Sequence, residues 1–282
     1  MILVLGKTGQ VGSELSKIEG VECFERDQLN LANPDDCFAA ITQYKPHAVI
    51  NAAAYTSVDK AEEEEDLAHL INAEAPKAIA KACSYLEIPL VHISTDYVFD
   101  GTGISAWQTF DCPKPLNSYG RSKFGGEIYV REYAKNYVIL RTSWIVSSYR
   151  TNFLKTMLRI SETQSRLGVV NDQIGGPTPA HSIASACVKI ANKLAVSPNM
   201  SGIYHLSGSP DVSWCQFANE IFKQVGRKTV AEPIPTSEFP TSAKRPLNSR
   251  LDCQMIKEVF NINRPHWRQE LSKIFQDLEV MT

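Results

Sequence analysis

The chain has 282 residues, of which 43% are hydrophobic and 21% are charged, and its formal net charge is −2. This composition is typical of a folded protein with an ordinary core, and a charge so close to zero argues against electrostatic binding of nucleic acid or anionic membranes. The length allows one large α/β domain or two unequal domains.

The first predicted elements are a strand, a glycine-rich turn and a helix. Ile2–Leu5 is a short apolar run, and Gly6, Gly9 and Gly12 follow it with the spacing G-x-x-G-x-x-G. Such glycines let the backbone approach a pyrophosphate, which then lies at the helix N-terminus. A Gly-Lys-Thr sequence also ends the ATP-binding P-loop, but that loop requires a glycine at position 1, where this chain has methionine. The turn therefore predicts a dinucleotide site.

A second predicted strand, Val21–Phe24, ends at the charged sequence Glu25-Arg26-Asp27. In a dinucleotide-binding fold this strand end lies beside the adenosine ribose. An acidic residue there binds the 2′-hydroxyl of NADH, whereas Arg26 can pair with the 2′-phosphate of NADPH. Both residue types are present, so NADH remains possible, and the availability of Arg26 favours NADPH.

Strand and helix signals alternate over the next hundred residues. In chain order, the predicted elements are a helix over 33–44, a strand over 47–51, a long helical region over 59–86, a strand over 89–95, a helix over 117–136 and a strand over 137–141. Such alternation predicts an α/β fold of the Rossmann type, which is a doubly wound parallel sheet with helices on both faces.

The pattern loosens after Trp144. Helical character returns over 151–164, and Val169 and Val170 indicate one more strand. Glycine and proline become frequent over 175–179 and 232–246, where we expect loops.

This change of pattern predicts two parts of unequal size. We expect residues 1–145 to form an NADP-binding Rossmann domain, to which residues 165–195 return. Residues 146–282 are then expected to form a smaller C-terminal α/β lobe for the substrate.

Segment lengths and cysteine spacing predict a cytoplasmic protein. No segment has the roughly 18 apolar residues needed to cross a bilayer, and the apolar start of the chain is too short for a signal peptide. The seven cysteines are dispersed without a Cys-x-x-Cys pair, a pattern typical of reduced thiols rather than disulfides or a zinc site. We expect neither a membrane partner nor a nucleic-acid partner.

A phenol and an ammonium group lie four residues apart in Tyr119 and Lys123. On a helix the two side chains share a face, and a nearby Lys⁺ lowers the pKa of a phenol, so Tyr119 can exchange a proton at neutral pH. Ser94 and Thr95 end the strand at 89–95, and open α/β sheets bind ligands beyond such carboxyl ends. We expect Thr95 to hydrogen-bond a substrate carbonyl, Tyr119 to give it a proton, and a nicotinamide to deliver hydride to its carbon.

Ten stretches, in order along most of the chain, resemble the extended short-chain dehydrogenase/reductase family. They are GKTGQVGSEL, VINAAAYTSVDKAE, INAEAPKAIAKA, STDYVFDG, PLNSYGRSKFGGE, ILRTSWI, NFLKTML, VVNDQIGGPT, GIYHLSG and RPLNSRLD. Within that family, the resemblance is to the branch that reduces the C4 keto group of dTDP-4-dehydro-β-L-rhamnose with NADPH. It implies an oxidoreductase of nucleotide-sugar synthesis that makes dTDP-L-rhamnose for polysaccharides.

The resemblance also implies residue roles. Thr95, Tyr119 and Lys123 form the catalytic triad, and Lys123 also holds the nicotinamide ribose. To the three glycines and Arg26 the resemblance adds further cofactor positions: Gln10 and Val11 at the pyrophosphate, Asn30 and Leu31 near the adenine, and Ala52, Ala53 and Tyr55 beside the nicotinamide. To Ser94 it adds the substrate positions Thr56, Val58, Asp96, Tyr97, Phe99, Trp144, Gln173, Arg245, Asn248 and Ser249, of which Arg245 is expected to meet the diphosphate.

One departure from the family concerns a metal ion. Some members dimerise through a magnesium ion held by glutamates, and Glu14 matches the first of these positions. His181 stands at the second position and Asp277 at the third. Because magnesium prefers oxygen ligands to imidazole, this set disfavours a magnesium-bridged dimer, while a homodimer of another kind remains possible.

Two alternative functions remain open. One is a related sugar-nucleotide 4-ketoreductase that gives the C4 epimer, a 6-deoxy-talose, because no motif fixes which sugar face meets the nicotinamide. The other is a non-catalytic NADP-binding subunit, like the regulatory subunit of methionine adenosyltransferase, which resembles the same family. An intact Tyr119 and Lys123 do not exclude it, because a site can persist without turnover.

Overall fold

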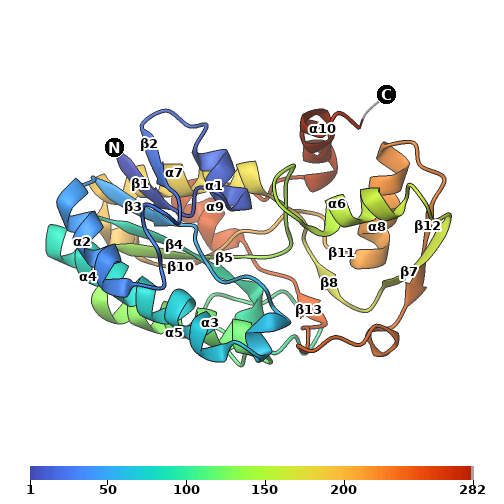
Figure 1. Cartoon of the computed structure of the whole chain (residues 1–282), viewed down its shortest axis with the longest axis horizontal. Helices are drawn as coiled ribbons and strands as arrows, with labels where there is room; N and C mark the ends of the chain where they lie inside the picture. The colour runs from blue at the N-terminus through green and yellow to red at the C-terminus, as the bar shows by residue number, and fades with distance from the viewer. Residues whose placement is uncertain (281–282) are drawn as a thin grey trace.

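Six parallel strands form the central sheet of the protein in a computed structural model that describes residues 1–280 (Figure 1). In spatial order they are β10 (Gly202–His205), β5 (Tyr137–Thr142), β4 (Leu90–Thr95), β3 (Ala48–Asn51), β1 (Ile2–Leu5) and β2 (Val21–Phe24). Strands β1, β3 and β4 are buried throughout, as expected for apolar runs in a sheet covered on both faces. The strand order reverses at β1, so the carboxyl ends of β1 and β3 border a switch point, where open α/β sheets bind ligands.

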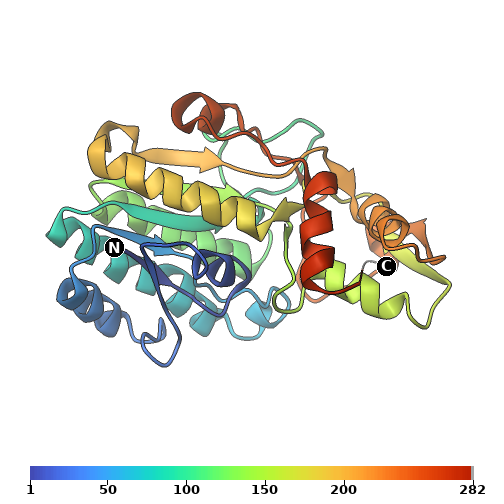
Figure 2. The same ribbon diagram turned by 90° about the horizontal axis from the view of Figure 1, so that it is seen from above.

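Helices cover both faces of the central sheet, which confirms the doubly wound Rossmann-type fold. One face packs against α1 (Gln10–Leu15), α7 (Ala180–Val196) and α9 (Gln254–Phe260), and the other against α2 (Pro34–Tyr44), α4 (Ala75–Leu86) and α5 (Ser118–Tyr133). Figure 2 shows α7, in yellow, running along the sheet beside β10. None of the helices within residues 1–280 combines the length and hydropathy needed to cross a membrane.

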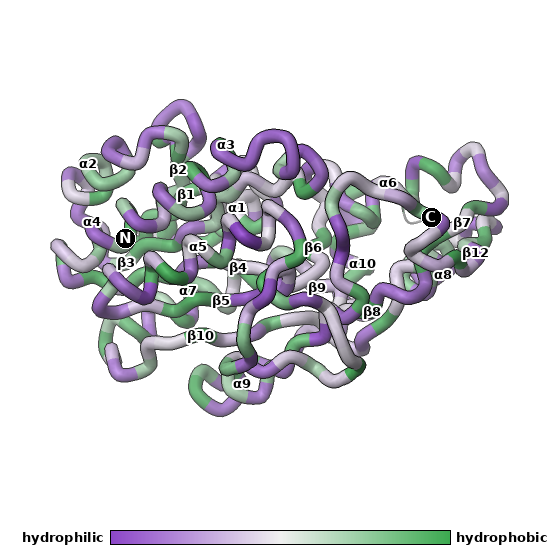
Figure 3. Tube along the Cα trace, turned by 90° about the horizontal axis from the view of Figure 1, so that it is seen from below, coloured by the Kyte–Doolittle hydropathy of each residue, from purple (hydrophilic) through white to green (hydrophobic). Residues whose placement is uncertain are grey.

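The helical region expected over 59–86 is divided into four pieces. They are η1 (Lys60–Glu62), α3 (Glu65–His69), the π-helical turn η2 (Leu70–Glu74) and α4. In the π-helical turn, the Asn72 side chain accepts a hydrogen bond from the backbone N of Tyr55 (2.8 Å) and donates to the Ser122 hydroxyl of α5 (3.0 Å). This turn therefore fastens the segment after β3 to α5. The acidic run that leads into α3 is hydrophilic, whereas β3 in the middle of the sheet is hydrophobic, as Figure 3 shows.

A separate core lies beyond the central sheet, on the right of Figure 1. The largest of its buried side chains are the aromatic rings of Phe217, Phe222, Trp267 and Phe275. Its helices are α6 (Phe153–Ile160), α8 (Trp214–Gln224) and α10 (Trp267–Asp277). The short strands in and around this part are β6 (Ile145–Val146), β7 (Arg166–Val170), β8 (Ile174–Gly175), β9 (Thr178–Pro179), β11 (Val212–Ser213), β12 (Val230–Ile234) and β13 (Asn248–Ser249). Along the described residues, the chain also forms the 3-10 turns η3 (Asp96–Val98), η4 (Pro198–Met200) and η5 (Thr236–Glu238).

Two stretches that were expected to be loops contain strand residues. The sequence at 175–179 includes the end of β8 and all of β9, and the sequence at 232–246 begins inside β12, which pairs in parallel with β7. Proline was the reason for expecting a loop at 232–246, and Pro233 lies within β12. It is tolerated there because β12 has a partner on one side only, as an edge strand does.

The return of the chain to the central sheet differs from the expected segment 165–195. Strand β7 pairs with β12, outside the central sheet, whereas α7 packs on that sheet and β10 pairs with β5. The division of the chain near residue 145 stays a prediction, and these contacts favour a return that begins with α7, continues with β10 and includes α9.

Candidate active site

The glycine turn after β1 forms a backbone cradle. Gly6 has a φ of 101°, which favours glycine, and a Cβ on Gly6 would lie 2.8 Å from the Cα of Ala53. A Cβ on Gly12 would lie 1.9 Å from the carbonyl oxygen of Gly6, and Gly9 donates its N–H to that same oxygen (3.0 Å). The turn can fold this tightly only because Gly6 and Gly12 have no side chains. A dinucleotide pyrophosphate at a switch point needs such a tight turn, because its phosphates approach the backbone closely. The residues of the turn therefore fit the pyrophosphate of a dinucleotide such as NADP.

Gln10 and Val11, predicted beside the pyrophosphate, begin α1. Val11 is buried in the core beneath the turn. The Gln10 Oε1 accepts hydrogen bonds from the hydroxyl of Ser147 (2.8 Å) and from the Nδ2 of Asn152 (3.0 Å). Gln10 therefore ties the segment before α6 to the turn, and its backbone, in the first turn of α1, is the part that remains available to a phosphate.

The predicted adenine-side residues follow β2. Glu25 forms an ion pair with Lys7, with 2.8 Å between Oε1 and Nζ, and Arg26 is exposed beside it. Leu31 is buried in the core, and Asn30 accepts a backbone hydrogen bond through its side chain within the same turn. Lys7 is held in this ion pair, and Arg26 is the exposed cation of the turn that follows β2.

The predicted nicotinamide-side residues follow β3. Ala52, Ala53 and Tyr55 are partly buried, and the side chain of Asn51 accepts a hydrogen bond from the backbone N of Ala53 (3.2 Å). The phenol of Tyr55 donates to Glu64 (2.6 Å). The segment is thus held at both of its ends, and Ala53 lies against Gly6 of the glycine turn.

The start of α5 brings Tyr119 to the end of β4. Asn117 caps the helix by accepting a hydrogen bond from the N–H of Gly120 (2.8 Å). Gly120 has no side chain, and a Cβ there would lie 2.3 Å from the carbonyl oxygen of Tyr97, so glycine lets α5 pack directly on η3. As a result the rings of Tyr97 and Tyr119 meet edge to face at 5.6 Å, and the Thr95 side chain is near enough to the Tyr119 phenol to act to lower its pKa. The predicted pair of Thr95 and Tyr119 is therefore brought together.

The ionisation of Tyr119 differs from the expectation. Burial raises the pKa of its phenol to about 12, and the Lys123 ammonium donates to the carbonyl oxygen of Ile93 (2.7 Å) rather than to the phenol. Burial also lowers the pKa of Lys123 to about 8. The sequence could not show this, because the spacing of Tyr119 and Lys123 says nothing of how deeply each is buried. At neutral pH the phenol is protonated and Lys123 is largely charged.

Two buried polar atoms at the strand ends have no hydrogen-bond partner within residues 1–280. They are the Oδ2 of Asp96, which follows β4, and the hydroxyl of Thr142, which ends β5. Thr142 is aligned with Thr95 in the register of the two strands. Burial raises the pKa of Asp96 to about 7. Unpaired buried atoms are costly, so these two mark the strand ends as a place where a ligand supplies partners.

Trp144, a predicted substrate residue, follows the end of β5 and packs against the second core. Its φ is 48°, and its ring stacks on that of Trp214 with centroids 3.5 Å apart. A Cβ on Gly175 would lie 2.8 Å from the indole of Trp144. Gln173, also predicted, accepts a hydrogen bond from the indole N–H of Trp214 (3.2 Å). Trp144 and Gln173 are thus joined through Trp214, which the sequence analysis did not single out.

Arg245, expected to meet a diphosphate, forms a bidentate pair with Asp59. The distances are 3.1 Å from Nη1 to Oδ1 and 2.6 Å from Nη2 to Oδ2, and the pair lowers the pKa of Asp59. The predicted residues Thr56 and Val58 lie just before Asp59, and Thr56 is exposed. Asp59 itself was missed, although it lies in a stretch that resembles the family.

The remaining predicted substrate residues lie on β13 or are buried at and just after the end of β4. Asn248 donates from Nδ2 to the carbonyl oxygen of Ser105 (2.7 Å), and the buried Ser249 is near enough to Asp96 to influence its pKa. Ser94 donates its hydroxyl to Glu127, and Phe99 is fully buried. As substrate contacts Ser94 and Phe99 therefore stay predictions, and their burial favours a supporting role.

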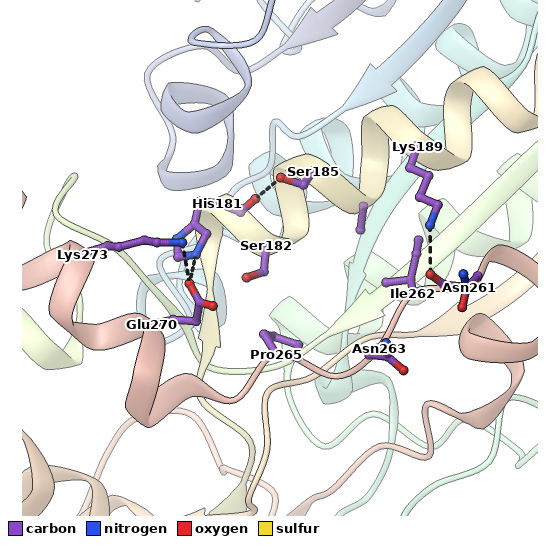
Figure 4. Close-up of a pocket in the computed structure, with 11 residues that line it drawn as sticks. His181, Ser182, Ser185, Lys189, Asn261, Ile262, Asn263, Pro265, Glu270 and Lys273 are labelled. Carbon is purple, nitrogen blue, oxygen red and sulfur yellow. Dashed lines mark hydrogen bonds and ion pairs between the residues drawn. The ribbon is translucent and has the colours of Figure 1, made fainter.

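The three residues that match the family's magnesium positions make other contacts. His181 Nε2 lies 2.7 Å from Oε2 of Glu270, as the close-up in Figure 4 shows. Glu14 pairs with Lys17 (3.1 Å), and Lys17 lies 4.0 Å from Asp277. No group of three or more His, Cys, Asp or Glu side chains placed to hold a metal occurs within residues 1–280.

A family model described as the RmlD substrate binding domain matches residues 1–280. The dTDP-4-dehydrorhamnose reductase of Aggregatibacter actinomycetemcomitans is 40% identical over 97% of this chain and 97% of that protein. The reductase of the same name from Escherichia coli strain K12 is 36% identical over 100% of this chain and 99% of its own. Each match extends over both the central sheet and the second core.

The solved structures agree with these relatives. The dTDP-4-dehydrorhamnose reductase of Bacillus anthracis in complex with NADP is 35% identical, with a TM-score of 0.90 over 98% of each chain. The alignment covers nearly all of both proteins, so the similarity includes the glycine turn and the end of β4 as well as the sheet.

Proposed function

The chain belongs to the RmlD substrate binding domain family, and from this membership we propose that it reduces the C4 keto group of dTDP-4-dehydro-β-L-rhamnose to give dTDP-L-rhamnose. It is an oxidoreductase that uses NADPH, with NADH as a possible substitute. One observation supports the proposal: Tyr119 lies near Thr95 at the carboxyl end of β4, with Lys123 one turn further along the same helix, in a chain that matches such reductases over its whole length.

The chemistry follows from the ionisation states of these side chains. When bound, NADPH supplies the hydride that adds to C4. Tyr119 keeps its proton at neutral pH and gives it to the C4 oxygen, which becomes more basic than a phenolate as the ketone is reduced. Thr95 orients that oxygen by hydrogen bonding, and the charged Lys123 stabilises the phenolate that remains.

The binding roles of the other residues are part of the proposal. The glycine cradle holds the pyrophosphate, Asp96 and Thr142 offer their unpaired atoms to the ligand, and Trp144 borders the sugar. Arg245 meets the diphosphate, which requires it to share or exchange its pairing with Asp59. We propose that the central sheet binds the cofactor and that the second core contributes the substrate side.

An assay with the intact chain tests this function. Purified protein is mixed with NADPH and dTDP-4-dehydro-β-L-rhamnose, the loss of NADPH absorbance is followed, and the product is identified by NMR. We expect stoichiometric oxidation and dTDP-L-rhamnose. A 6-deoxy-talose product would identify the epimer-forming reductase instead. No oxidation at high protein concentration, together with NADPH binding, would identify a non-catalytic subunit.

Replacing Arg26 with alanine is expected to weaken NADPH binding by about 10–100-fold, because a hydrogen bond to a charged group contributes about 1.5–3 kcal/mol. Binding of NADH, which lacks the 2′-phosphate, is expected to change little. Both dissociation constants are measured by fluorescence titration, with Asp27→Ala as a control at the neighbouring exposed position. Equal losses for the two cofactors would show that Arg26 does not contact the 2′-phosphate.

A further inference from the structure

We propose that Glu127 is a positioning residue for this reaction: its buried carboxylate clamps α5 to β4 and β5 and acts as the counter-charge of Lys123. The inference rests on the proposed function, because Lys123 and Tyr119 are the groups on which Glu127 acts. Neither the motifs of the sequence nor the names of the relatives assign a role to Glu127.

The Glu127 carboxylate makes a complete set of short hydrogen bonds inside the protein. It is 0% exposed, and Arg141, its partner, is 1% exposed. Oε1 accepts from the Nε of Arg141 (2.9 Å) and from the hydroxyl of Ser94 (2.6 Å), and Oε2 accepts from the Nη2 of Arg141 (2.7 Å). The carboxylate thus joins three elements, α5, β4 and β5, through one group.

The three joined elements are those that carry the reacting side chains. Tyr119, Lys123 and Glu127 are spaced four residues apart on α5, so they share one face of the helix. The strand partners of the carboxylate, Ser94 and Arg141, are aligned in register and each stands one residue before the strand end, next to Thr95 and Thr142. A shift of Glu127 would therefore move Tyr119 relative to Thr95.

Stability alone does not account for such a pair. Two charges buried together lose their hydration, and an apolar pair of the same size is often as stable or more stable. Arg141 is also enclosed by uncharged neighbours: the ring of Phe99 lies 5.0 Å from its guanidinium carbon, and His205 lies 3.5 Å from Nη1. Burial lowers the pKa of His205 to about 3, so that ring is neutral. The pair is better explained by the orientation and charge that it gives to the site.

The charge of Lys123 is set by groups on three elements. On α5, Glu127 favours the ammonium, and Tyr119 is protonated. On β4, His92 is neutral, because burial and Lys123 both lower its pKa. On β5, Arg141 carries a positive charge that Glu127 neutralises. Glu127 is therefore the one negative charge in this set, and without it the burial of Lys123, which disfavours the ammonium, is unopposed.

Two substitutions distinguish the effect of the shape of the Glu127 side chain from the effect of its charge. Glu127→Gln keeps the shape and removes the charge. We expect the pKa of Lys123 to fall, so that the alkaline limb of the kcat profile moves down by about one pH unit or more, because a nearby opposite charge favours the charged form of a group. Glu127→Asp keeps the charge but cannot reach Ser94 and Arg141 together. We expect its alkaline limb to stay in place while kcat falls by about 10–100-fold through misplacement of Tyr119.

The control is Val130→Ala, which removes buried, uncharged side-chain atoms from the same helix. It is expected to lower the melting temperature without moving the alkaline limb. An unshifted limb in Glu127→Gln, or wild-type kcat in Glu127→Asp, would overturn the proposal. If Glu127→Gln does not fold, the kcat of Glu127→Asp decides.

A measurement without substrate keeps this proposal separate from the proposed function. Protein with ¹³C-labelled lysine is titrated by NMR, and the Lys123 signal is assigned from its absence in Lys123→Met. We expect the Lys123 titration to move to lower pH in Glu127→Gln and to remain in Glu127→Asp. An unchanged titration in Glu127→Gln would overturn the inference even in an active enzyme. An inactive wild-type protein with the expected titrations would instead refute only the proposed function.

Discussion

Replacing Tyr119 with phenylalanine is expected to lower kcat by about 10²–10⁴-fold, the range over which a positioned acid usually accelerates a reaction. The substitution removes the only hydroxyl of a side chain whose ring already packs against Tyr97 and whose helix is fixed at its start by Asn117. The ring can therefore stay in place while the proton donor is lost. Steady-state kinetics with the dehydro sugar nucleotide measures the loss.

The binding of NADPH provides the check on this interpretation. The glycine cradle is built from the backbone of the turn after β1, so the dissociation constant for NADPH should change by less than about threefold in Tyr119→Phe. Tyr129→Phe removes a hydroxyl from the same helix, nearly three turns further on, and is expected to keep wild-type turnover. Wild-type turnover in Tyr119→Phe would show that another group gives the proton.

The parts of the fold that were predicted correctly depend on local chemistry. The buried runs at 47–51 and 89–95, the proline-led helix at 33–44 and the glycines after the first strand each have a local cause that one sequence displays. The helix that carries Tyr119 was also predictable, because Asn117 stands as a cap before it. For the same reason the sequence could assign a candidate site to the end of β4, which stays a prediction.

The parts that were missed depend on distant partners. Strand β12 contains Pro233 and forms only because β7 offers an edge some sixty residues earlier in the chain. Arg245 pairs with Asp59, which is 186 residues away in the sequence, and no local sequence pattern predicts that pair. The pKa of Tyr119 is raised because the folded chain buries it, a quantity absent from a spacing of four residues. The sequence shows Glu127 one helical turn after Lys123, but it does not show the hydrogen bonds to Ser94 and Arg141 from which we infer a role for Glu127.

Replacing Gly12 with alanine is expected to abolish NADPH binding at micromolar concentrations and to lower the melting temperature by on the order of 10 °C. The added Cβ would lie 1.9 Å from the carbonyl oxygen of Gly6 and 3.0 Å from the Cα of Lys7. Both neighbours are backbone atoms, so no side chain can turn away, and α1 must separate from the turn that forms the cradle. Fluorescence titration and thermal unfolding measure the two effects.

Gly9 offers a matched control within the same turn. Its φ is −75°, and a Cβ there would lie 3.4 Å from the carbonyl oxygen of Gly6, which a small displacement relieves. Gly9→Ala is therefore expected to keep the melting temperature within about 2 °C, and any loss of NADPH affinity in this variant reports on the cofactor's own approach to the turn. If Gly12→Ala unfolded at the wild-type temperature and bound NADPH normally, the close contact between Gly12 and Gly6 would not be what shapes the cradle.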